Sequence, residues 1–173
     1  YAGVAAARVG EKRILELVDK YGSSMVLQAM EELLDYGEKM TRAALSTIAS
    51  GVYEAEDIIE DDGLGNGPFV VKVKITIAAD KFIADFTGSA PQAKGPVNTT
   101  FSGLFTGARC LFKAITDPSI PANGGCFRML EVICPPGTVL TAVEPAPVSM
   151  NFQARNAAVD VMWQLDGQEG VVA

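Results

Sequence analysis

The spacing of apolar residues changes near Gly51, and this change constrains the fold more than any other feature of the sequence. Before Gly51, apolar side chains recur every three or four residues, as they do along one face of an α-helix. After it, in the segment VKVKITI, they alternate with Lys and Thr, as in a strand with one buried face. The sequence therefore predicts helices followed by a sheet, which is the α+β class.

Two helices are predicted within residues 1–50, separated by the break Tyr-Gly-Ser-Ser at residues 21–24. Ser23 or Ser24 is the expected N-cap of the second helix, and Gly51 the expected end of its C-terminal turn. Because the break is short, we expect the two helices to form a hairpin. Their apolar stripes are Ala7, Gly10, Ile14, Leu17, Val18 and Tyr21 in the first, and Val26, Met30, Leu33, Gly37, Met40, Ala44 and Ile48 in the second.

Residues 51–173 are predicted to form an α+β segment with a largely antiparallel sheet and packed helices. The strand at 71–77 turns through 78–81 into a second strand that ends at Phe86, and a strand at 52–59 joins the same sheet. A further strand is expected near 127–133. A helix at 99–116, capped by Asn98 or a Thr, is expected to pack its two glycines against the sheet. The two glycines are Gly103 and Gly107. A last helix is predicted from the apolar residues Phe152, Ala158 or Val159, Met162 and Leu165.

Composition and charge exclude several classes of function. The net charge is -7 and the 14 basic residues are scattered, which argues against nucleic acid as a partner. No apolar run approaches the length of a membrane span. Three cysteines without a C-x-x-C pair indicate reduced thiols in a cytoplasmic protein. These cysteines are Cys110, Cys126 and Cys134.

The absence of histidine excludes the commonest catalytic arrangements. Neither a Ser-His-Asp nor a Cys-His site is available, and the commonest metal ligand is missing. The chain also has no G-x-S-x-G elbow and no phosphate-binding G-x-x-x-x-G-K-[ST] loop. A complete hydrolase within these residues alone is therefore not expected.

The acidic segment EDDGLGNG at residues 60–67 permits two functional interpretations that we reject. Asp61 and Asp62 lie beside glycine, but the alternating oxygen ligands and terminal Glu of a calcium loop are missing. The glycines precede a strand rather than a helix, which excludes a dinucleotide fingerprint. We interpret the segment as a turn, or alternatively as an acidic surface for a partner subunit.

The loop DFTGSAPQAKGPVN, residues 85–98, is the main candidate for an active-site segment. Asp85 and Lys94 are its candidate catalytic residues, since both are titratable and neither belongs to the apolar face of the strand. Each also has a structural interpretation. Asp85 can accept N–H groups of the following turn, and Lys94 can be a solvated loop tip.

These segments together resemble the hydantoinase B family over nearly the whole chain. Members of that family are considerably longer, so the sequence resembles an internal segment of one. The most specific patterns are DFTG..PQ..GP.N and P..P.N.G..R...V..PPG. The matching segments, in order, are ARVGEKRILELVDKYG, AMEELLDYGEKMTRAAL, GVYEAEDIIEDDG, DFTGSAPQAKGPVN, DPSIPANGGCFRMLEVICPPGTVL and PAPVS.

The resemblance implies a component of an ATP-dependent enzyme that works with a hydantoinase A-type subunit and the remaining segments of its own chain. ATP is expected on the partner, and the ligands of a divalent metal outside this segment. The first expectation is hydrolysis of a cyclic amide such as a hydantoin, oxoproline or lactam. The alternatives are ATP-dependent carboxylation of a ketone, and a scaffold or subunit-interface role with the chemistry elsewhere.

The resemblance also marks loop residues as organisers of a small-molecule substrate pocket. Where the family often has Arg-Pro, this sequence has Arg128-Met129, so the substrate end is expected to differ. No metal ligand is assigned within this segment, and the segment alone is expected to be inactive. The substrate-loop candidates are Thr87, Gly88, Asn98, Asn123 and Arg128.

Overall fold

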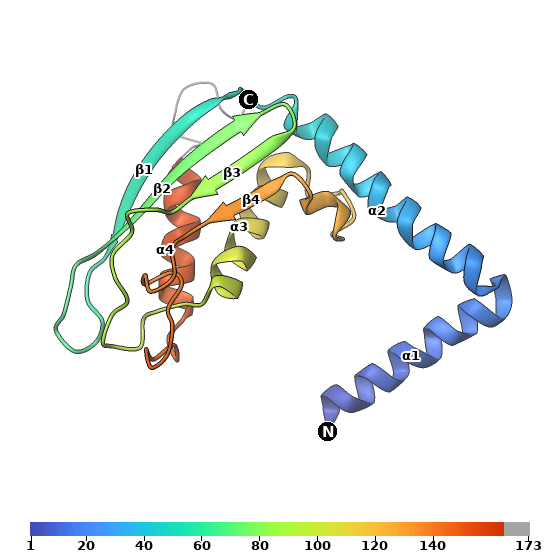
Figure 1. The fold of residues 1–173 in the computed structure, drawn as a ribbon, viewed down its shortest axis with the longest axis horizontal. Coiled ribbons are helices and arrows are strands. Elements are labelled where there is room, and N and C mark those ends of the chain that lie inside the picture. The colour runs from blue at the N-terminus through green and yellow to red at the C-terminus, as the bar shows by residue number, and fades with distance from the viewer. Residues whose placement is uncertain (165–173) are drawn as a thin grey trace.

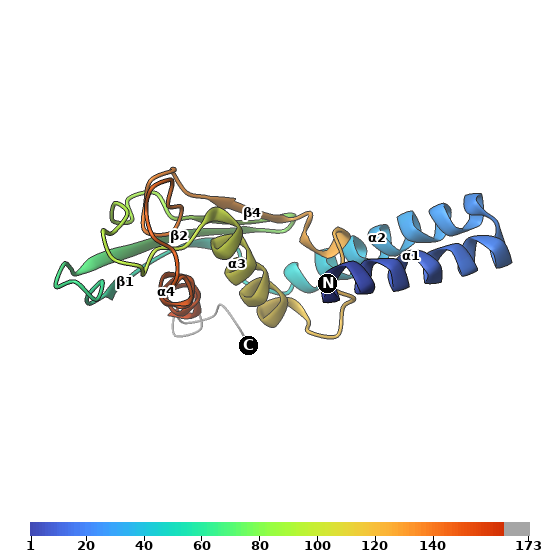
Figure 2. The ribbon, with the colours of Figure 1, turned by 90° about the horizontal axis from the view of Figure 1, so that it is seen from below.

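A four-stranded sheet with two helices on one face forms the body of the protein, and a two-helix arm extends from it (Figures 1 and 2). The computed structural model describes residues 1–164, so the predicted helical residue Leu165 lies outside the described part. Among the helices of residues 1–164, none combines the length and apolar character that a bilayer crossing requires. The helices are α1 (Ala2–Tyr21), α2 (Ser23–Leu45), α3 (Phe101–Thr116) and α4 (Phe152–Trp163); the strands are β1 (Gly51–Ile59), β2 (Phe69–Ala78), β3 (Lys81–Asp85) and β4 (Leu130–Ile133), with a 3-10 turn, η1, at Gly125–Phe127.

The sheet has the strand order β1-β2-β3-β4 and is mixed. The β1–β2 and β2–β3 pairs are antiparallel, as predicted, whereas β3 and β4 are parallel. The α+β class is thus confirmed, but the largely antiparallel sheet is corrected to a mixed one. A parallel neighbour requires a crossover connection, and the segment containing α3 supplies it between β3 and β4.

Alternation along β2 separates the two faces of the sheet. Val71, Val73, Ile75 and Ile77 are buried against the helices, while the lysines between them point to the open face. Phe82 and Ala84 continue the buried face on β3. Burying one such aliphatic side chain contributes about 1.5–3 kcal/mol, so this row is a main source of the stability of the body.

Helices α3 and α4 cover the same face of the sheet and pack against each other (Figure 2). Gly107 allows this approach, since a Cβ there would lie 3.0 Å from a methyl carbon of Val159 in α4. The expectation that Gly103 and Gly107 pack against the sheet is therefore wrong, because Gly107 meets α4 and Gly103 meets the Thr99 hydroxyl.

The predicted caps of α2 differ from the observed ones, whereas the predicted N-cap position of α3 is met by a threonine. Ser23 and Ser24 lie inside α2, whose N-cap is Gly22 at a φ of 82°. Helix α2 ends at Leu45, so Gly51 begins β1 instead of ending the helix. At α3 the N-cap is Thr100, which is the threonine alternative of the prediction, although its side chain makes no cap hydrogen bond; the other candidate, Asn98, bonds elsewhere through its amide.

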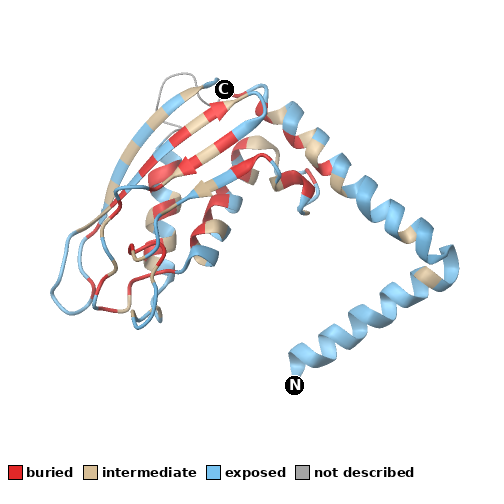
Figure 3. Ribbon diagram, in the orientation of Figure 1, coloured by how far each residue is buried: buried red, intermediate tan, exposed pale blue. Residues whose placement is uncertain are grey.

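The arm diverges from the turn at Gly22, so that α1 and α2 form a V (Figure 1). No residue of α1 is buried, and Figure 3 shows this helix almost entirely exposed. The C-terminal half of α2 contacts η1 closely enough that a Cβ on Gly125 would overlap the Leu34 carbonyl group. This contact holds α2 to the body.

A buried carboxylate joins the β1–β2 loop to the loop that follows β3. Asp62 is fully buried, and its Oδ2 accepts the Gly95 N–H at 2.8 Å. Its Oδ1 accepts the N–H groups of Leu64 and Asn66 at 2.9 and 3.1 Å, and the Asn66 amide also donates to it. Burial acts to raise the pKa of Asp62, but the bonds from Asn66, Leu64 and Gly95 outweigh burial and lower the pKa to about 2. Asp62 therefore faces its own chain, not a partner.

Substitution of Gly125 tests the attachment of the arm. Because a Cβ at Gly125 would overlap backbone atoms of Leu34, we expect Gly125→Ala to lower the free energy of unfolding by about 1–3 kcal/mol. Gly124→Ala is the matched control, since a Cβ there would lie 3.6 Å from Leu34 Cδ2, an ordinary contact. Urea unfolding of both variants measures the difference, and equal stabilities would contradict the proposed close approach.

Substitution of Asp62 tests the buried carboxylate. The folded-state pKa of about 2 lies below the usual 3.8, so ionised Asp62 stabilises the fold above pH 3.8, and this stabilisation is lost as pH falls through 2. We expect Asp62→Asn to be less stable at pH 7 and to lose less stability between pH 3.8 and 2. Exposed Asp61, which accepts the N–H of nearby Gly63, provides the control Asp61→Asn. Parallel pH slopes for wild type and Asp62→Asn would contradict this role.

Candidate functional site

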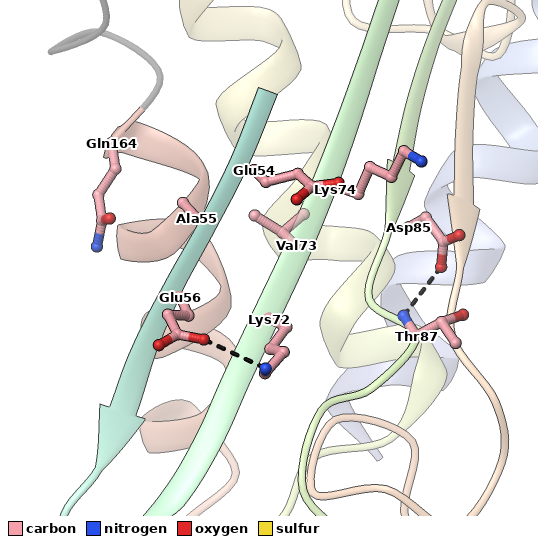
Figure 4. Close-up of a pocket in the computed structure, with 9 residues that line it drawn as sticks. All are labelled: Glu54, Ala55, Glu56, Lys72, Val73, Lys74, Asp85, Thr87 and Gln164. Carbon is pink, nitrogen blue, oxygen red and sulfur yellow. Dashed lines mark hydrogen bonds and ion pairs between the residues drawn. The ribbon is translucent and has the colours of Figure 1, made fainter. Parts of the chain in front are cut away.

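The open face of the sheet contains a polar depression of about 650 Å³ at the end of β3 (Figure 4). Its charged residues lie on the side of β2 opposite the buried row and come from three neighbouring strands, while Val73 of the buried row and its register partner Ala55 also contribute to the lining. The predicted loop enters it at Asp85 and Thr87. The depression is lined by Glu54, Ala55, Glu56, Lys72, Val73, Lys74, Asp85, Thr87 and Gln164.

Strand register places acids on both sides of a lysine in this depression. Lys74 pairs with Glu54 on β1 and with Asp85 on β3, so the three residues form a row across the sheet. In the next row, Lys72 Nζ lies 3.3 Å from a carboxylate oxygen of Glu56. Both side chains of that pair are at least half exposed, so the ion pair adds little to stability. The surface thus offers both hydrogen-bond donors and acceptors to a polar ligand.

The first part of the loop is held to the strand end by local hydrogen bonds. Asp85 Oδ1 accepts the Thr87 N–H at 2.9 Å, which is the turn expected from the sequence. Gly88 follows at a φ of 93°, a conformation that favours glycine. The Ser89 hydroxyl then bonds both the N–H and the carbonyl of Lys72, at 3.0 and 3.2 Å. Asp85, Thr87 and Gly88 are therefore fixed beside β2.

The second part of the loop is organised by a buried amide. Asn98 is fully buried, and its Oδ1 accepts the Ala93 N–H at 2.7 Å. Its Nδ2 donates to the carbonyls of Ala93, Gly95 and Pro147. The Asn98 amide thus shapes the loop and links it to the segment before α4. Lys94 is exposed on the same part of the loop and does not line the depression.

Asn123 and Arg128 lie in a third place, against α2. Asn123 Nδ2 donates to the Leu33 carbonyl at 2.9 Å, and its Oδ1 accepts the N–H groups of Gly125 and Cys126. Arg128 Nη1 bonds Asp35 and Glu38 at 2.9 and 2.7 Å. These contacts join the loop before β4 to the arm.

The ion pair of Arg128 also changes the titration of its partner. The hydrogen bond from Arg128, followed by that from Arg42, lowers the pKa of Glu38, and the bonds from Glu38 and Asp35 raise the pKa of Arg128. Arg128 is 40% exposed, so the network is screened by solvent. The two ion pairs connect the residue before β4 to α2, as a structural contact does.

The structure thus brings together three of the seven sequence-predicted site residues. Asp85 and Thr87 line the depression and Gly88 follows directly after them, whereas the other four lie elsewhere. A role of any of the seven in substrate binding stays a prediction. Sequence reasoning missed the charged residues of β1 and β2, since their alternation was interpreted only as a solvated face. The register of the β2–β3 hairpin sets Lys74 beside Asp85, and this register would have been the signal for a charged site.

The described residues do not fit a metal ion or a nucleotide. Within residues 1–164, no group of three or more His, Cys, Asp or Glu side chains is arranged to hold a metal. The two lysines of the depression each face carboxylates, which oppose binding of a triphosphate. Burial raises the pKa of the Cys134 thiol, and all three cysteines are unpaired, as predicted.

Comparison with known proteins gives consistent matches over nearly the whole chain. The hydantoinase B/oxoprolinase family model matches residues 1–173. A protein of Pseudomonas sp. (strain NS671), the putative B component of a D-/L-hydantoinase, is 30% identical over 172 residues, which cover 93% of this chain and 29% of that protein. The chain therefore spans under a third of the length of this relative.

Two solved structures share the fold. The ATP-dependent caprolactamase of Pseudomonas jessenii has a TM-score of 0.81 and 28% identity, covering 93% of this chain and 29% of its own. A nucleotide-free acetone carboxylase has a TM-score of 0.80 at 16% identity, covering 92% and 22%, and shows the fold alone. Because the family model matches from the first to the last residue, this chain belongs to the hydantoinase B/oxoprolinase family.

Proposed function

We propose that this chain is part of an ATP-dependent enzyme that hydrolyses a cyclic amide, such as a hydantoin, oxoproline or lactam. The observation that carries the proposal is the likeness to the ATP-dependent caprolactamase, which extends over 93% of the chain with 28% identity. The relative named as a component of a D-/L-hydantoinase supports the same class of substrate. Since the chain spans only 29% of either relative, other segments complete the enzyme.

In this proposal the polar depression holds one side of the amide substrate. A cyclic amide presents a carbonyl acceptor and an N–H donor on adjacent atoms. The ammonium group of Lys74 donates to such a carbonyl, and the Asp85 carboxylate accepts from such an N–H. The register of β2 and β3 sets these two residues opposite each other. A hydrogen bond to a charged group contributes about 1.5–3 kcal/mol, which is enough to orient a small ligand.

ATP, the divalent metal and the hydantoinase A-type subunit belong to the proposal as parts outside these residues. ATP supplies the activation of the amide oxygen, and its binding site is assigned to the partner. The support for ATP is the likeness to the caprolactamase, which is itself ATP-dependent. A reducing cytoplasmic location is proposed with it, because all three cysteines are free.

Substitution of Asp85 tests whether the depression binds the substrate. Asp85→Asn keeps an oxygen that accepts the Thr87 N–H, so the turn is preserved while the charge is removed. We expect kcat/KM for amide-coupled ATP hydrolysis to fall about 10–100-fold, the loss of one charged hydrogen bond. The control is Asp80→Asn, an exposed acid in the turn between β2 and β3. The measurement uses the full-length protein with its partner, and a panel of hydantoins, 5-oxoproline and lactams.

Two outcomes would change the assignment. Turnover only with a ketone and bicarbonate would favour the alternative carboxylase. Unchanged kinetics of Asp85→Asn on an active substrate would leave Asp85 as a turn residue and favour a scaffold role for this segment.

A further inference from the structure

Lys72, at the edge of the depression, is held in place by groups of this chain at its backbone, its stem and its charged end. The Ser89 hydroxyl accepts the Lys72 N–H and donates to the Lys72 carbonyl, at 3.0 and 3.2 Å. A Cβ placed on Gly88 would lie 3.7 Å from Lys72 Cδ, so the lysine stem passes beside this turn. The ammonium nitrogen then lies 3.3 Å from a carboxylate oxygen of Glu56 (Figure 4). The depression therefore contains a cation whose position is set before any ligand binds.

The pairing of Lys72 with Glu56 follows from the register of β1 and β2. The two residues are directly opposite each other in the antiparallel pair, and both side chains are exposed on the open face of the sheet. Opposite charges in such cross-strand positions attract each other. Because this pair is at least half exposed, it contributes little to folding. The Glu56 carboxylate nevertheless competes with any second anion for the ammonium group of Lys72.

The second lysine of the depression is surrounded by carboxylates in the same way. Lys74 has Glu54 as its register partner on β1 and Asp85 as its partner on β3. The described lining thus contains three carboxylates and two ammonium groups, which gives it a net charge of -1. Each of these lysines shares its charge with at least one acid of a neighbouring strand.

This balance of charge distinguishes two kinds of cyclic amide. An uncharged ring such as 2-pyrrolidinone requires only single hydrogen-bond donors and acceptors around its amide group. A charge-paired lysine still supplies these donors, because an ammonium group has three N–H bonds and one carboxylate oxygen occupies one of them. A ring that carries a carboxylate, such as 5-oxoproline, additionally requires a cation with unbalanced positive charge. Such a carboxylate would also be repelled by the acids of the lining.

Resting on the hydrolysis of a cyclic amide proposed above, we propose that the depression selects a ring without a carboxylate and that Glu56 determines this selection. The Glu56 carboxylate neutralises Lys72, which would otherwise attract the carboxylate of a substrate. The selection depends on contacts within β1, β2 and the loop after β3, all of which belong to this chain. The substrate class is thereby narrowed from cyclic amides in general to uncharged lactams and hydantoins.

Removal of the Glu56 charge tests the selection on two matched pairs of rings. The pairs are 2-pyrrolidinone with 5-oxoproline and hydantoin with hydantoin-5-acetic acid, and each pair differs by a carboxylate-bearing position. The measured quantity is kcat/KM for amide-coupled ATP hydrolysis by the full-length protein with its partner. We expect the wild type to prefer the uncharged ring, and Glu56→Gln to lower this preference by about fivefold, the effect of one exposed charge pair.

Two control variants separate the effect of Lys72 from other effects. Glu131→Gln removes the same charge from an exposed position of β4 outside the depression, and we expect it to leave the preference unchanged. Glu56→Gln combined with Lys72→Gln should restore the preference, because the freed ammonium group is then absent. The backbone bonds of residue 72 to Ser89 remain in this double variant. A purely structural role of the pair would change the rates with both rings of a pair equally.

The outcomes separate the selection from the proposed function. Hydrolysis of the rings with an unchanged preference in Glu56→Gln overturns the selection and leaves the hydrolysis of cyclic amides standing. A wild type that prefers the carboxylate-bearing rings also overturns it, since another segment of the protein then supplies the cation. Turnover of none of the four rings overturns the proposed function and the selection together. A thermal melting curve of each variant confirms that it is folded.

Discussion

The ionised carboxylate of Asp62 is the constraint that fixes the path of the loop following the candidate site. A charge without contact to water is stable only when hydrogen bonds replace its hydration, and here Leu64, Asn66 and Gly95 supply them. The bond to Gly95 spans 33 residues of sequence and fixes the loop after β3 to the loop after β1. This bond adds to the backbone bonds of the same loop, in which Gln92 N–H donates to the Gly137 carbonyl and Thr99 N–H to the Val139 carbonyl. The Asn98 amide completes this attachment from the other side.

The single covered face of the sheet explains where a polar site is available. Since α3 and α4 lie on one face only, the alternate residues of β1, β2 and β3 form an open charged surface (Figure 2). Antiparallel register then sets Lys74 opposite acids of both neighbouring strands, and Lys72 opposite Glu56 of β1. The depression is therefore a consequence of strand alternation combined with register. The turn at Asp85 adds backbone and side-chain groups at its end, because β3 stops where β2 continues.

Local patterns predicted the helices, the β1–β3 strands and the Asp85 turn, since each depends on residues close in sequence. The parallel pairing of β4 was not predictable, because it depends on a crossover of more than 40 residues. The same reason applies to Asn98, interpreted as a helix cap, whose partner Pro147 is 49 residues away. Arg128 is predicted to be a substrate-loop residue, and the acids that it contacts lie on α2, 90 and 93 residues away. The family resemblance identified the sequence segments that contain these residues. Their contacts became visible only in the structure, because the partner residues are distant in sequence.

The distribution of charge separates the two surfaces that this chain offers. The arm is nearly neutral and exposes apolar side chains, whereas most of the net negative charge lies in the body with the sheet. The depression on the open sheet face offers hydrogen-bond donors and acceptors to a small polar ligand, whereas the surface between α1 and α2, lined by residues such as Leu17, Met25 and Leu33, is apolar. The candidate site therefore lies on the body, and the arm is not part of it.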